Sequence, residues 1–323
     1  MPASMSDFRF APYFDVAVAS RIGVGNATRA ENQDNFVVID FDGRACTLQD
    51  QAPHHTSIAD WPHGHGRLAV LDGMGGHGHG REAAEAVASA LLALPPLMTL
   101  EALSSALDAL HTELQARLGA TFGNASRPGT TLTLLELRAH GAPLLYHVGD
   151  SRLYRLAPGG ATALTIDHVP ATLAALDGRL DEDGWRRQVY GRHTPQIAQA
   201  FILGNAFADP TRLSDGLYAL TAQNVPPWLA HLPDRRVLPL DADACYLLAT
   251  DGFWSCATPS EVLDQWPRLL ADSPGAATLV ERLFDALDSA QPPGLQPDNL
   301  TALVLRPLPR ASDETALPVD AEK

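Results

Sequence analysis

Three aspartates lie beside apolar, strand-like runs that are far apart in the sequence. Asp72 and Asp251 each close such a run and Asp298 precedes one, and the three runs span residues 68–71, 245–249 and 300–305. Carboxylates at the edges of buried strands are poorly solvated and repel one another, so a cluster of them is tolerated mainly where cations neutralise it. Oxygen ligands of this kind suit hard divalent ions such as Mg2+ and Mn2+. The three aspartates therefore predict a divalent metal site if the fold brings them together.

Each of these acids also has a simpler interpretation as part of a turn. Asp72-Gly73, Pro297-Asp298-Asn299 and Gly149-Asp150-Ser151 are all common turn sequences. The glycines that follow Asp72 favour a functional role, because they let the backbone approach an ion or a phosphate closely. Gly149-Asp150-Ser151 could also begin a serine-hydrolase motif. Against this, the chain has no Gly-x-Ser-x-Gly elbow and no Asp-x-x-His near its C-terminus.

Neither the histidines nor the cysteines predict a zinc site. Six histidines crowd one region, at positions 54, 55, 63, 65, 77 and 79, but their spacing fits no standard zinc site and favours a polar loop. Cys46, Cys245 and Cys256 form no CxxC pair and are odd in number. We therefore expect no disulfide framework, and we expect the protein to reside in a reducing compartment.

The composition is that of an ordinary globular protein with an acidic balance. Its 323 residues allow one large domain or two small ones, and an apolar content of 46% supports a sizeable core. The formal net charge of -15 argues against general binding to nucleic acid or to anionic membranes. Residues 1–21 contain no apolar signal core, and no apolar run approaches the roughly 20 residues of a membrane span. We therefore expect a soluble, cytoplasmic protein.

Hydrophobic periodicity indicates the elements that must position the acids. Alternating or short buried runs predict strands, and apolar residues three or four apart predict helices. We expect strands over residues 14–20, 35–40, 68–71, 130–137, 143–148, 152–156, 161–166, 237–240, 245–250 and 300–305. We expect helices over residues 83–94, 100–118, 171–176, 196–201, 260–270 and 276–290. The four strands between residues 130 and 166 indicate one antiparallel meander.

Blocks of strands that alternate with helices favour an α+β fold of two antiparallel sheets flanked by helices. Residues 41–67 show little periodicity and are interpreted as a surface insertion that could form a long hairpin. Residues 167–233 are long and irregular. The acidic, proline-bearing residues after 307 are expected to be disordered.

Seven short motifs are spread over most of the chain. They are Arg29–Phe36, Asp72–His77, Gly129–Thr131, Val148–Arg152, Asp167–His168, Thr250–Trp254 and Pro297–Thr301. In kind and in order these motifs resemble those of the metal-dependent type-2C (PPM-type) serine/threonine protein phosphatases, bacterial members in particular. The resemblance covers roughly residues 14–307, and two stretches within it, 41–67 and 168–233, match poorly.

The resemblance implies a four-layer α/β/β/α sandwich of two antiparallel sheets flanked by helix pairs, with the metal site at one edge. Residues 1–12 would be an N-terminal extension, residues 13–307 the phosphatase domain and residues 308–323 an acidic, disordered tail. Within the domain, residues 41–67 would form an insertion and residues 168–233 a variable flap that influences substrate choice.

The resemblance also implies two to three divalent cations, Mn2+ or Mg2+, as cofactors. On the matching residues, Asp72 would bridge two ions and the Gly73 carbonyl would be a second ligand. Asp251 and Asp298 would complete the shell of the first ion, and Asp34 would act near the second ion through water.

Two further residues carry roles by resemblance. Asp150 matches an acid that binds a third, weaker ion, and Arg29 matches the anchor of the substrate phosphate, a task that suits the guanidinium fork. The implied reaction is hydrolysis of phosphoserine or phosphothreonine in proteins by a metal-activated water, with Arg29, Asp72 and Asp251 as catalytic residues. The implied partners are a phosphoprotein substrate and a Ser/Thr kinase, with no nucleic acid and no membrane.

Three residues depart from the family pattern. Gln33 stands where many members have Glu, Ser255 replaces an acid linked to the third ion, and Met74 stands where many eukaryotic members have a general-acid histidine. Gln33, Ser255 and the unusual segment 167–233 keep a second interpretation open, whereas bacterial members of the family commonly share Met74. Methionine cannot donate a proton, so protonation of the leaving group falls to water or to a neighbour such as His77. The alternative is a catalytically weak or silent relative that binds phosphoproteins as a sensor module.

Overall fold

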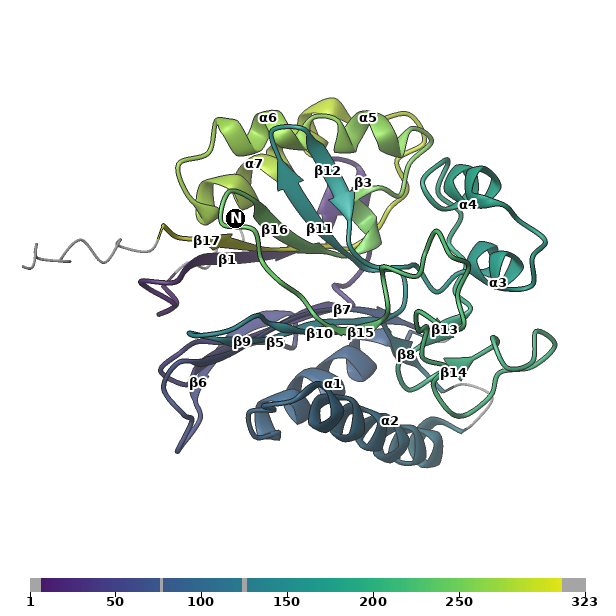
Figure 1. Ribbon diagram of the computed structural model, residues 1–323, viewed down its shortest axis with the longest axis horizontal. Helices are drawn as coiled ribbons and strands as arrows, with labels where there is room; N and C mark the ends of the chain where they lie inside the picture. The colour runs from purple at the N-terminus through teal and green to yellow at the C-terminus, as the bar shows by residue number, and fades with distance from the viewer. Residues whose placement is uncertain (1–6, 76–77, 124–126, 310–323) are drawn as a thin grey trace, which may run out of the picture.

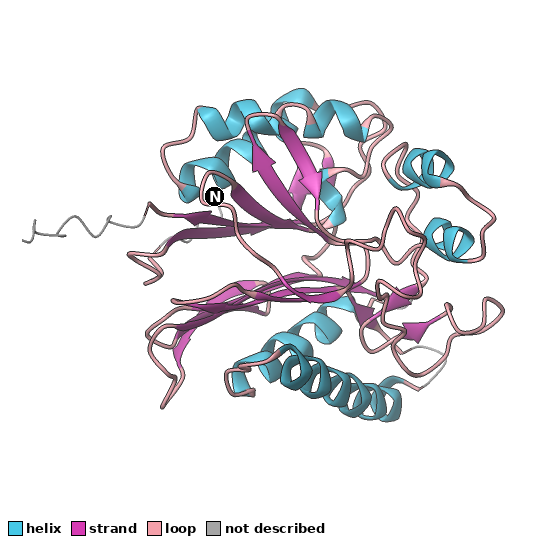
Figure 2. Ribbon diagram, in the orientation of Figure 1, coloured by secondary structure: helices cyan, strands magenta, loops and turns pink. Residues whose placement is uncertain are grey.

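Two antiparallel β-sheets pack face to face, and helices cover their outer faces (Figure 1). In this computed structural model, the structure describes residues 7–75, 78–123 and 127–309. The order of layers is helix, sheet, sheet, helix (Figure 2). The expected α+β sandwich of four layers is therefore confirmed.

The smaller sheet is assembled from both ends of the chain. Its first and last strands in sequence pair along their whole length, from Phe14 opposite Pro307 to Arg21 opposite Leu300. The strand order is β1 (Phe14–Arg21), β17 (Leu300–Pro307), β16 (Cys245–Ala249), β11 (Arg152–Ala157) and β12 (Gly160–Ala163).

The larger sheet has eight strands and carries the hairpin that was expected as an insertion. Residues 44–57 form that hairpin at one edge of the sheet. The strand order is β15 (Arg235–Val237), β10 (Leu144–Val148), β9 (Leu132–Arg138), β7 (His65–Met74), β4 (Asp34–Ile39), β5 (Arg44–Gln49) and β6 (Ala52–Ser57), and β8 (Gly129–Thr130) pairs with the end of β7.

Helices follow the predicted apolar spacing on both outer faces. On the larger sheet lie α1 (Gly80–Ala93) and α2 (Leu100–Phe122), and on the smaller sheet lie α5 (Pro259–Leu263), α6 (Trp266–Ala271) and α7 (Ala276–Ala290) (Figure 1). The single helix predicted over residues 260–270 is thus divided into α5 and α6, because Pro267 stands in the first turn of α6. At one end of the sandwich lie α3 (Pro170–Leu176), α4 (Glu182–Val189), β13 (Gln199–Ala200) and β14 (Gly204–Asn205) (Figure 1).

Both faces of the central strands of each sheet are buried, and strand alternation divides the core into layers. In β1, Val16 and Val18 pack between the sheets, while Ala17 and Ala19 face the helices of the smaller sheet. Leu303 and Leu305 of β17 show the same division from Ala302 and Val304. Since all these positions are apolar, the sequence shows a continuous run where a half-exposed strand would alternate with polar residues.

Two predicted elements are wrong. The strands between residues 130 and 166 do not form one meander, because β9 and β10 belong to the larger sheet and β11 and β12 to the smaller one. The chain crosses between the sheets at Gly149, whose φ of 111° favours glycine. The helix predicted over residues 196–201 is instead extended: Phe201 exchanges two backbone hydrogen bonds with Thr130, at 2.8 and 3.1 Å. A short apolar run of this kind fits either element until tertiary pairing decides.

A fully buried ion pair fastens α1 to the larger sheet. Arg67 on β7 and Glu136 on β9 are paired in register, and the Arg67 Nε donates to a Glu136 carboxylate oxygen at 2.7 Å. The other guanidinium nitrogens donate to the Leu94 carbonyl at 3.0 Å and the Pro95 carbonyl at 2.9 Å, just beyond the end of α1. These carbonyls have no helical partner, so the arginine satisfies them.

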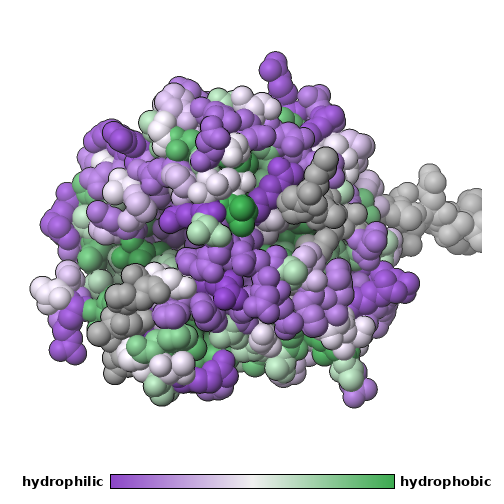
Figure 3. All heavy atoms as spheres, turned by 180° about the vertical axis from the view of Figure 1, so that it is seen from behind, coloured by the Kyte–Doolittle hydropathy of each residue, from purple (hydrophilic) through white to green (hydrophobic). Residues whose placement is uncertain are grey.

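The surface is mostly hydrophilic on the face turned away from the viewer of Figure 1, and apolar residues there form small separate patches (Figure 3). Within the described parts of the chain, no helix combines the length and apolarity that crossing a bilayer requires.

Glu136→Gln is expected to lower the free energy of unfolding by about 3–5 kcal/mol, because it leaves a buried guanidinium without its counter-charge. Urea unfolding followed by circular dichroism measures this change. Glu113→Gln is the matched control, since Glu113 is exposed and lies 3.8 Å from Arg117. If Glu136→Gln lowers the free energy of unfolding no more than the control does, the Arg67–Glu136 pair does not stabilise the fold as described.

Candidate active site

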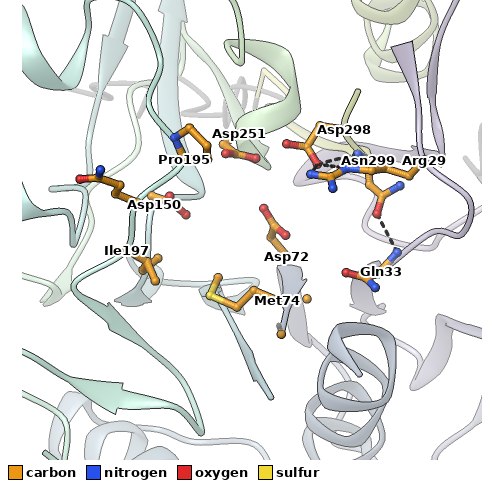
Figure 4. Close-up of a pocket in the computed structure, with 13 residues that line it drawn as sticks. Arg29, Gln33, Asp72, Met74, Asp150, Pro195, Ile197, Asp251, Asp298 and Asn299 are labelled. Carbon is orange, nitrogen blue, oxygen red and sulfur yellow. Dashed lines mark hydrogen bonds and ion pairs between the residues drawn. The ribbon is translucent and has the colours of Figure 1, made fainter. Parts of the chain in front are cut away.

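A pocket of about 260 Å³ opens where the ends of the two sheets meet. The side chains of Asp72, Asp251 and Asp298 point toward one another across it, and Asp150 lies at its other side (Figure 4). The complete wall comprises Arg29, Gln33, Asp72, Gly73, Met74, Gly75, Asp150, Pro195, Gln196, Ile197, Asp251, Asp298 and Asn299. The fold thus gathers six of the seven predicted site residues around one cavity.

The acids come from both sheets and are fixed through their backbones. Asp72 lies within β7, so the strand runs past the acid rather than ending at it as predicted. The Asp72 backbone N–H donates to the Thr131 hydroxyl at 2.9 Å, and the Thr131 N–H donates to the Asp72 carbonyl at 2.9 Å. Asp251 opens a single 3-10 turn directly after β16, and Asp298 stands two residues before β17.

Asp34 is the predicted site residue that does not line the pocket. It is buried on β4, in register with Asp72 on β7. The hydroxyls of Thr250 and Thr301 both donate to its Oδ2 atom, at 2.7 and 2.8 Å. The Asp34 side chain therefore accepts hydrogen bonds from residues in and beside the smaller sheet, while its backbone belongs to the larger sheet. Asp34 thus connects the two sheets directly behind the pocket.

Gly73 occupies a place where no side chain fits. A Cβ at this position would lie 2.3 Å from the Gly80 carbonyl oxygen and 2.4 Å from that of Gln33. The Gly73 N–H donates to the Gln33 carbonyl at 3.1 Å. The Asp72-Gly73 pair is thus a packing requirement as well as a candidate ligand pair, and the start of α1 lies directly against it.

The carboxylates resist being ionised together. Desolvation raises the pKa of Asp72 well above its usual range, and the charges of Asp34, Asp251, Asp298 and Asp150 raise it further. Desolvation also raises the pKa of Asp34 and of Asp150, and it raises that of Asp298 to about 6. Bound cations would remove this penalty.

Asp251 differs from its neighbours because a histidine lies beside it. The Nε2 atom of His193 is 3.1 Å from an Asp251 carboxylate oxygen, although its direction does not satisfy hydrogen-bond geometry. Burial is the largest single influence and favours the neutral form of Asp251, but His193, a hydrogen bond with Asp72 and the charge of Arg152 together lower the pKa of Asp251. The pKa of Asp251 is therefore shifted in the opposite direction from those of Asp34, Asp72, Asp150 and Asp298.

The donor set fits a hard divalent ion. The wall offers carboxylate oxygens and a backbone carbonyl, the ligands that Mg2+ and Mn2+ prefer, and no cysteine. Among the residues that the structure describes, no three His, Cys, Asp or Glu side chains converge into a ready-made cage. Mg2+ is commonly bound through only one or two carboxylates while it keeps several waters, so this open arrangement agrees with such an ion.

Arg29 lies on the pocket wall and is paired with one of the acids. Its Nη2 atom donates to the Asp298 carboxylate at 2.9 Å and its Nε at 3.2 Å, while just over half of the arginine side chain stays exposed. The guanidinium is thus within reach both of a candidate metal ligand and of any anion that enters from solvent.

Two of the departures from the family pattern, Gln33 and Met74, fall on this wall. The Gln33 side-chain amide donates to a Glu31 carboxylate oxygen at 2.8 Å, and the Gln33 backbone N–H donates to the Asn299 side chain at 2.8 Å (Figure 4). The Met74 side chain faces the pocket (Figure 4). Gly76 and His77, the latter weighed as a proton donor, lie outside the described residues. The buried Ser255 hydroxyl has no hydrogen-bond partner in the described chain.

Sequence reasoning missed the residues that hold the acids in place. Thr250 and Thr301 belong to matched motifs, but nothing in their spacing shows that both hydroxyls reach Asp34. The motifs do not include His193, and its approach to Asp251 depends on the path of residues 168–233. The wall contributed by residues 195–197 comes from the same irregular segment.

Comparison with known proteins finds sequence similarity to protein phosphatases. No protein-family model matches the chain. The serine/threonine protein phosphatase PstP of Mycobacterium tuberculosis is 30% identical over 241 residues, which cover 73% of this chain and 39% of PstP. A probable protein phosphatase 2C of rice is 25% identical over 139 residues, which cover 42% of this chain and 39% of that protein. The match thus spans about two fifths of the length of these relatives.

Solved structures share the fold. The M. tuberculosis PstP structure superposes with a TM-score of 0.60 at 23% identity, covering 92% of this chain and 100% of that one. A Streptococcus agalactiae serine/threonine phosphatase superposes with a TM-score of 0.62 at 17% identity, covering 91% and 99%. A structure of the PstP catalytic domain holds two manganese ions and superposes with a TM-score of 0.57 at 22% identity, covering 92% and 99%.

The raised pKa of Asp298 predicts how stability depends on pH when a chelator is present. A carboxyl with a higher pKa in the folded state binds its proton more tightly there, so the free energy of unfolding falls as pH rises from 3.8 to about 6 and stays lower above that. The shift corresponds to at most roughly 3 kcal/mol. Asp298→Asn removes this dependence, so its melting temperature in chelator should fall less between pH 4.5 and 7.5 than that of the wild type.

Asp285→Asn on α7 is the control, because Asp285 is exposed and remote from the pocket. Scanning calorimetry in EDTA at several pH values provides the measurement. If the melting temperatures of the wild type and of Asp298→Asn change equally with pH, the raised pKa of Asp298 is contradicted.

Proposed function

Because the chain belongs to the PPM-type (type-2C) serine/threonine protein phosphatase family of bacteria, we propose that it hydrolyses phosphoserine and phosphothreonine in proteins with divalent cations as cofactors. The observation that carries the proposal is the meeting of Asp72, Asp251 and Asp298, from distant parts of the chain, around one pocket with Arg29 at its rim. A pocket of acids that resist joint ionisation is suited to bind cations, and an arginine beside it is suited to bind phosphate.

Asp72, Asp251, Asp298 and the Gly73 carbonyl would hold the ions, with Asp150 available for a further, weaker one. When bound, such ions activate a water for in-line attack on phosphorus and offset the charge of the phosphoryl oxygens. The family resemblance implies two to three such ions, Mn2+ or Mg2+. The manganese-bound PstP structure supports the metal class.

The chain's own residues would position the reactants. Arg29 now pairs with Asp298, and a cation at Asp298 would compete with the guanidinium and leave its fork free for phosphate oxygens. Both threonine hydroxyls bond to Oδ2 of Asp34, so its Oδ1 atom can orient a water behind the pocket. Met74 supplies an apolar wall but no proton, so the leaving serine or threonine oxygen would take its proton from water.

The remainder of the chain fits the same proposal. The phosphatase domain would comprise residues 13–307, with residues 168–233 as a flap that contributes Pro195, Gln196 and Ile197 to the pocket. The substrate would be a phosphoprotein, produced by a Ser/Thr kinase and recognised in the cytoplasm.

Asp251→Asn is expected to reduce Mn2+-dependent turnover of p-nitrophenyl phosphate by at least about a hundredfold, because a carboxylate that would bind the cation is lost. Wild-type turnover should vanish in excess chelator and return with Mn2+. Asp264→Asn, at an exposed position on the end of α5, is the control and should retain activity. Turnover that persists in chelator would refute the scheme, and Mn2+ binding by calorimetry without any turnover would favour the silent sensor module.

Arg29→Gln is expected to raise the KM for a phosphopeptide about tenfold or more, since a charge-assisted contact to phosphate is lost. Arg44→Gln is a charge-matched control, because Arg44 is exposed at the start of β5 on the larger sheet. Steady-state kinetics of both variants at saturating Mn2+ separates the loss of a phosphate contact from the loss of one positive charge. An unchanged KM for Arg29→Gln would remove Arg29 from the phosphate site.

A further inference from the structure

A second cavity adjoins the pocket and is bordered by two unpaired arginines. It has a volume of about 320 Å³ and shares Asp150 and Gln196 with the pocket that holds the acids. Its wall also includes Asp167, Val169, Pro170, Ala171, Arg187, Gln188, Val189, Arg192, His193 and Thr194, together with Arg152. The two cavities are therefore neighbouring compartments of one depression.

The positive charge at this cavity is available because these arginines have no partner of their own. In the described part of the chain, the exposed side chains of Arg187 and Arg192 make no ion pair and no hydrogen bond. Four other described arginines lack a side-chain ion pair and hydrogen bond, namely Arg21, Arg44, Arg212 and Arg268, and of these Arg21 places its guanidinium over the Phe284 ring, 4.3 Å from the ring centroid. In a protein of net charge -15, free guanidinium groups are scarce, so two at one cavity are a local reversal of the overall charge.

The acids on the floor of the cavity do not cancel this charge. Asp167 is held by the buried Arg152, whose Nε and Nη2 atoms donate to its carboxylate at 2.9 and 2.7 Å. Asp150 faces the neighbouring pocket, where it is a candidate ligand for a cation. The side of the cavity exposed to solvent is therefore left to Arg187 and Arg192.

The arginines are carried on a rigid support. The Asp181 side chain caps α4 by accepting from the Gly184 N–H at 2.8 Å, and Trp185 packs against Tyr190 and Trp228. At the other end of α4, Arg152 Nη2 donates to the Val189 carbonyl at 2.8 Å. The helix that bears Arg187 is thus clamped to the floor of the cavity, so its guanidinium extends from a fixed base.

Arg192 lies next in sequence to a residue that contacts the acid cluster. Its neighbour His193 places Nε2 3.1 Å from Asp251, and the His193 N–H donates to the Cys256 carbonyl at 3.1 Å. Residues of an extended peptide advance about 3.3–3.6 Å each. A group one to three residues away from a phosphoresidue in the pocket would therefore reach the second cavity.

We propose that Arg187 and Arg192 form a subsite for a second anionic group on the substrate, so that this enzyme prefers phosphoproteins whose phosphoserine or phosphothreonine is flanked by another phosphoresidue or by acidic side chains. This inference rests on the proposed function of the neighbouring pocket. The guanidinium forks bind either a phosphate or a carboxylate, and a phosphate carries more charge.

The test compares three phosphopeptides of one sequence: a singly phosphorylated peptide with neutral flanks, one with aspartates within three residues of the phosphoserine, and one with a second phosphoserine there. The readout is the ratio of kcat/KM for each anionic peptide to that for the neutral one, with saturating Mn2+. In Arg187→Gln/Arg192→Gln this ratio is expected to fall about tenfold or more relative to the wild type, and the wild-type ratio should fall as salt is raised.

The control variant Arg186→Gln/Arg212→Gln changes the net charge equally. Arg186 lies on the same helix but pairs with Glu182 at 2.9 Å and lines a different cavity, and Arg212 is exposed in a loop. Its ratio should match that of the wild type. A wild-type ratio near one, or an equal fall in both double variants, would overturn the subsite.

A binding measurement keeps this result separate from the proposed function. Fluorescence anisotropy of the labelled doubly phosphorylated peptide in EDTA reports the arginine subsite without turnover. Weaker binding by Arg187→Gln/Arg192→Gln than by the control variant supports the subsite even if no peptide is hydrolysed, whereas equal binding contradicts it. Absence of turnover for every peptide would instead refute the phosphatase assignment alone.

Discussion

The constraint on which this structure depends is the repulsion among carboxylates that the fold forces together. Asp72, Asp251 and Asp298 come from three remote segments, and burial raises the pKa of Asp72 and of Asp298. On the part of the wall that the structure describes, Arg29 is the only basic residue, and it pairs with Asp298. A protein tolerates such a cluster when bound cations neutralise its charge. The convergence of the acids is therefore stronger evidence for a metal site than any single motif.

The surrounding contacts make this cluster durable. Thr131 fixes the backbone of Asp72, and the absence of a side chain at Gly73 lets α1 begin against the same strand. Thr250 and Thr301 reach across from the smaller sheet to Asp34 on the larger one. The site is therefore not a loop feature attached to the sandwich, because Asp72 and Asp34 lie on strands of the larger sheet and the hydrogen bonds to Asp34 join the two sheets behind the pocket.

Much of this could be predicted from the sequence, and the exceptions have a common physical origin. The helices over residues 83–94, 100–118 and 276–290 and most strands follow from local periodicity, which is a property of the chain alone. The crossing at Gly149 was missed because strands on both sides of it have the same apolar pattern, whichever sheet they join. The extended path of residues 199–201 depends on pairing with residues 204–205 and on the bridge between Phe201 and Thr130, and no local pattern contains that bridge. The approach of His193 to Asp251 and the exclusion of Asp34 from the pocket wall likewise arise from tertiary contacts.

The central claim is that the three remote aspartates bind cations together. Anomalous diffraction from crystals grown with Mn2+ tests it most directly, because manganese scatters anomalously and the protein atoms hardly do. The account predicts anomalous peaks between the carboxylates of Asp72, Asp251 and Asp298. A pocket without peaks at saturating Mn2+, or peaks confined to other parts of the molecule, would contradict it.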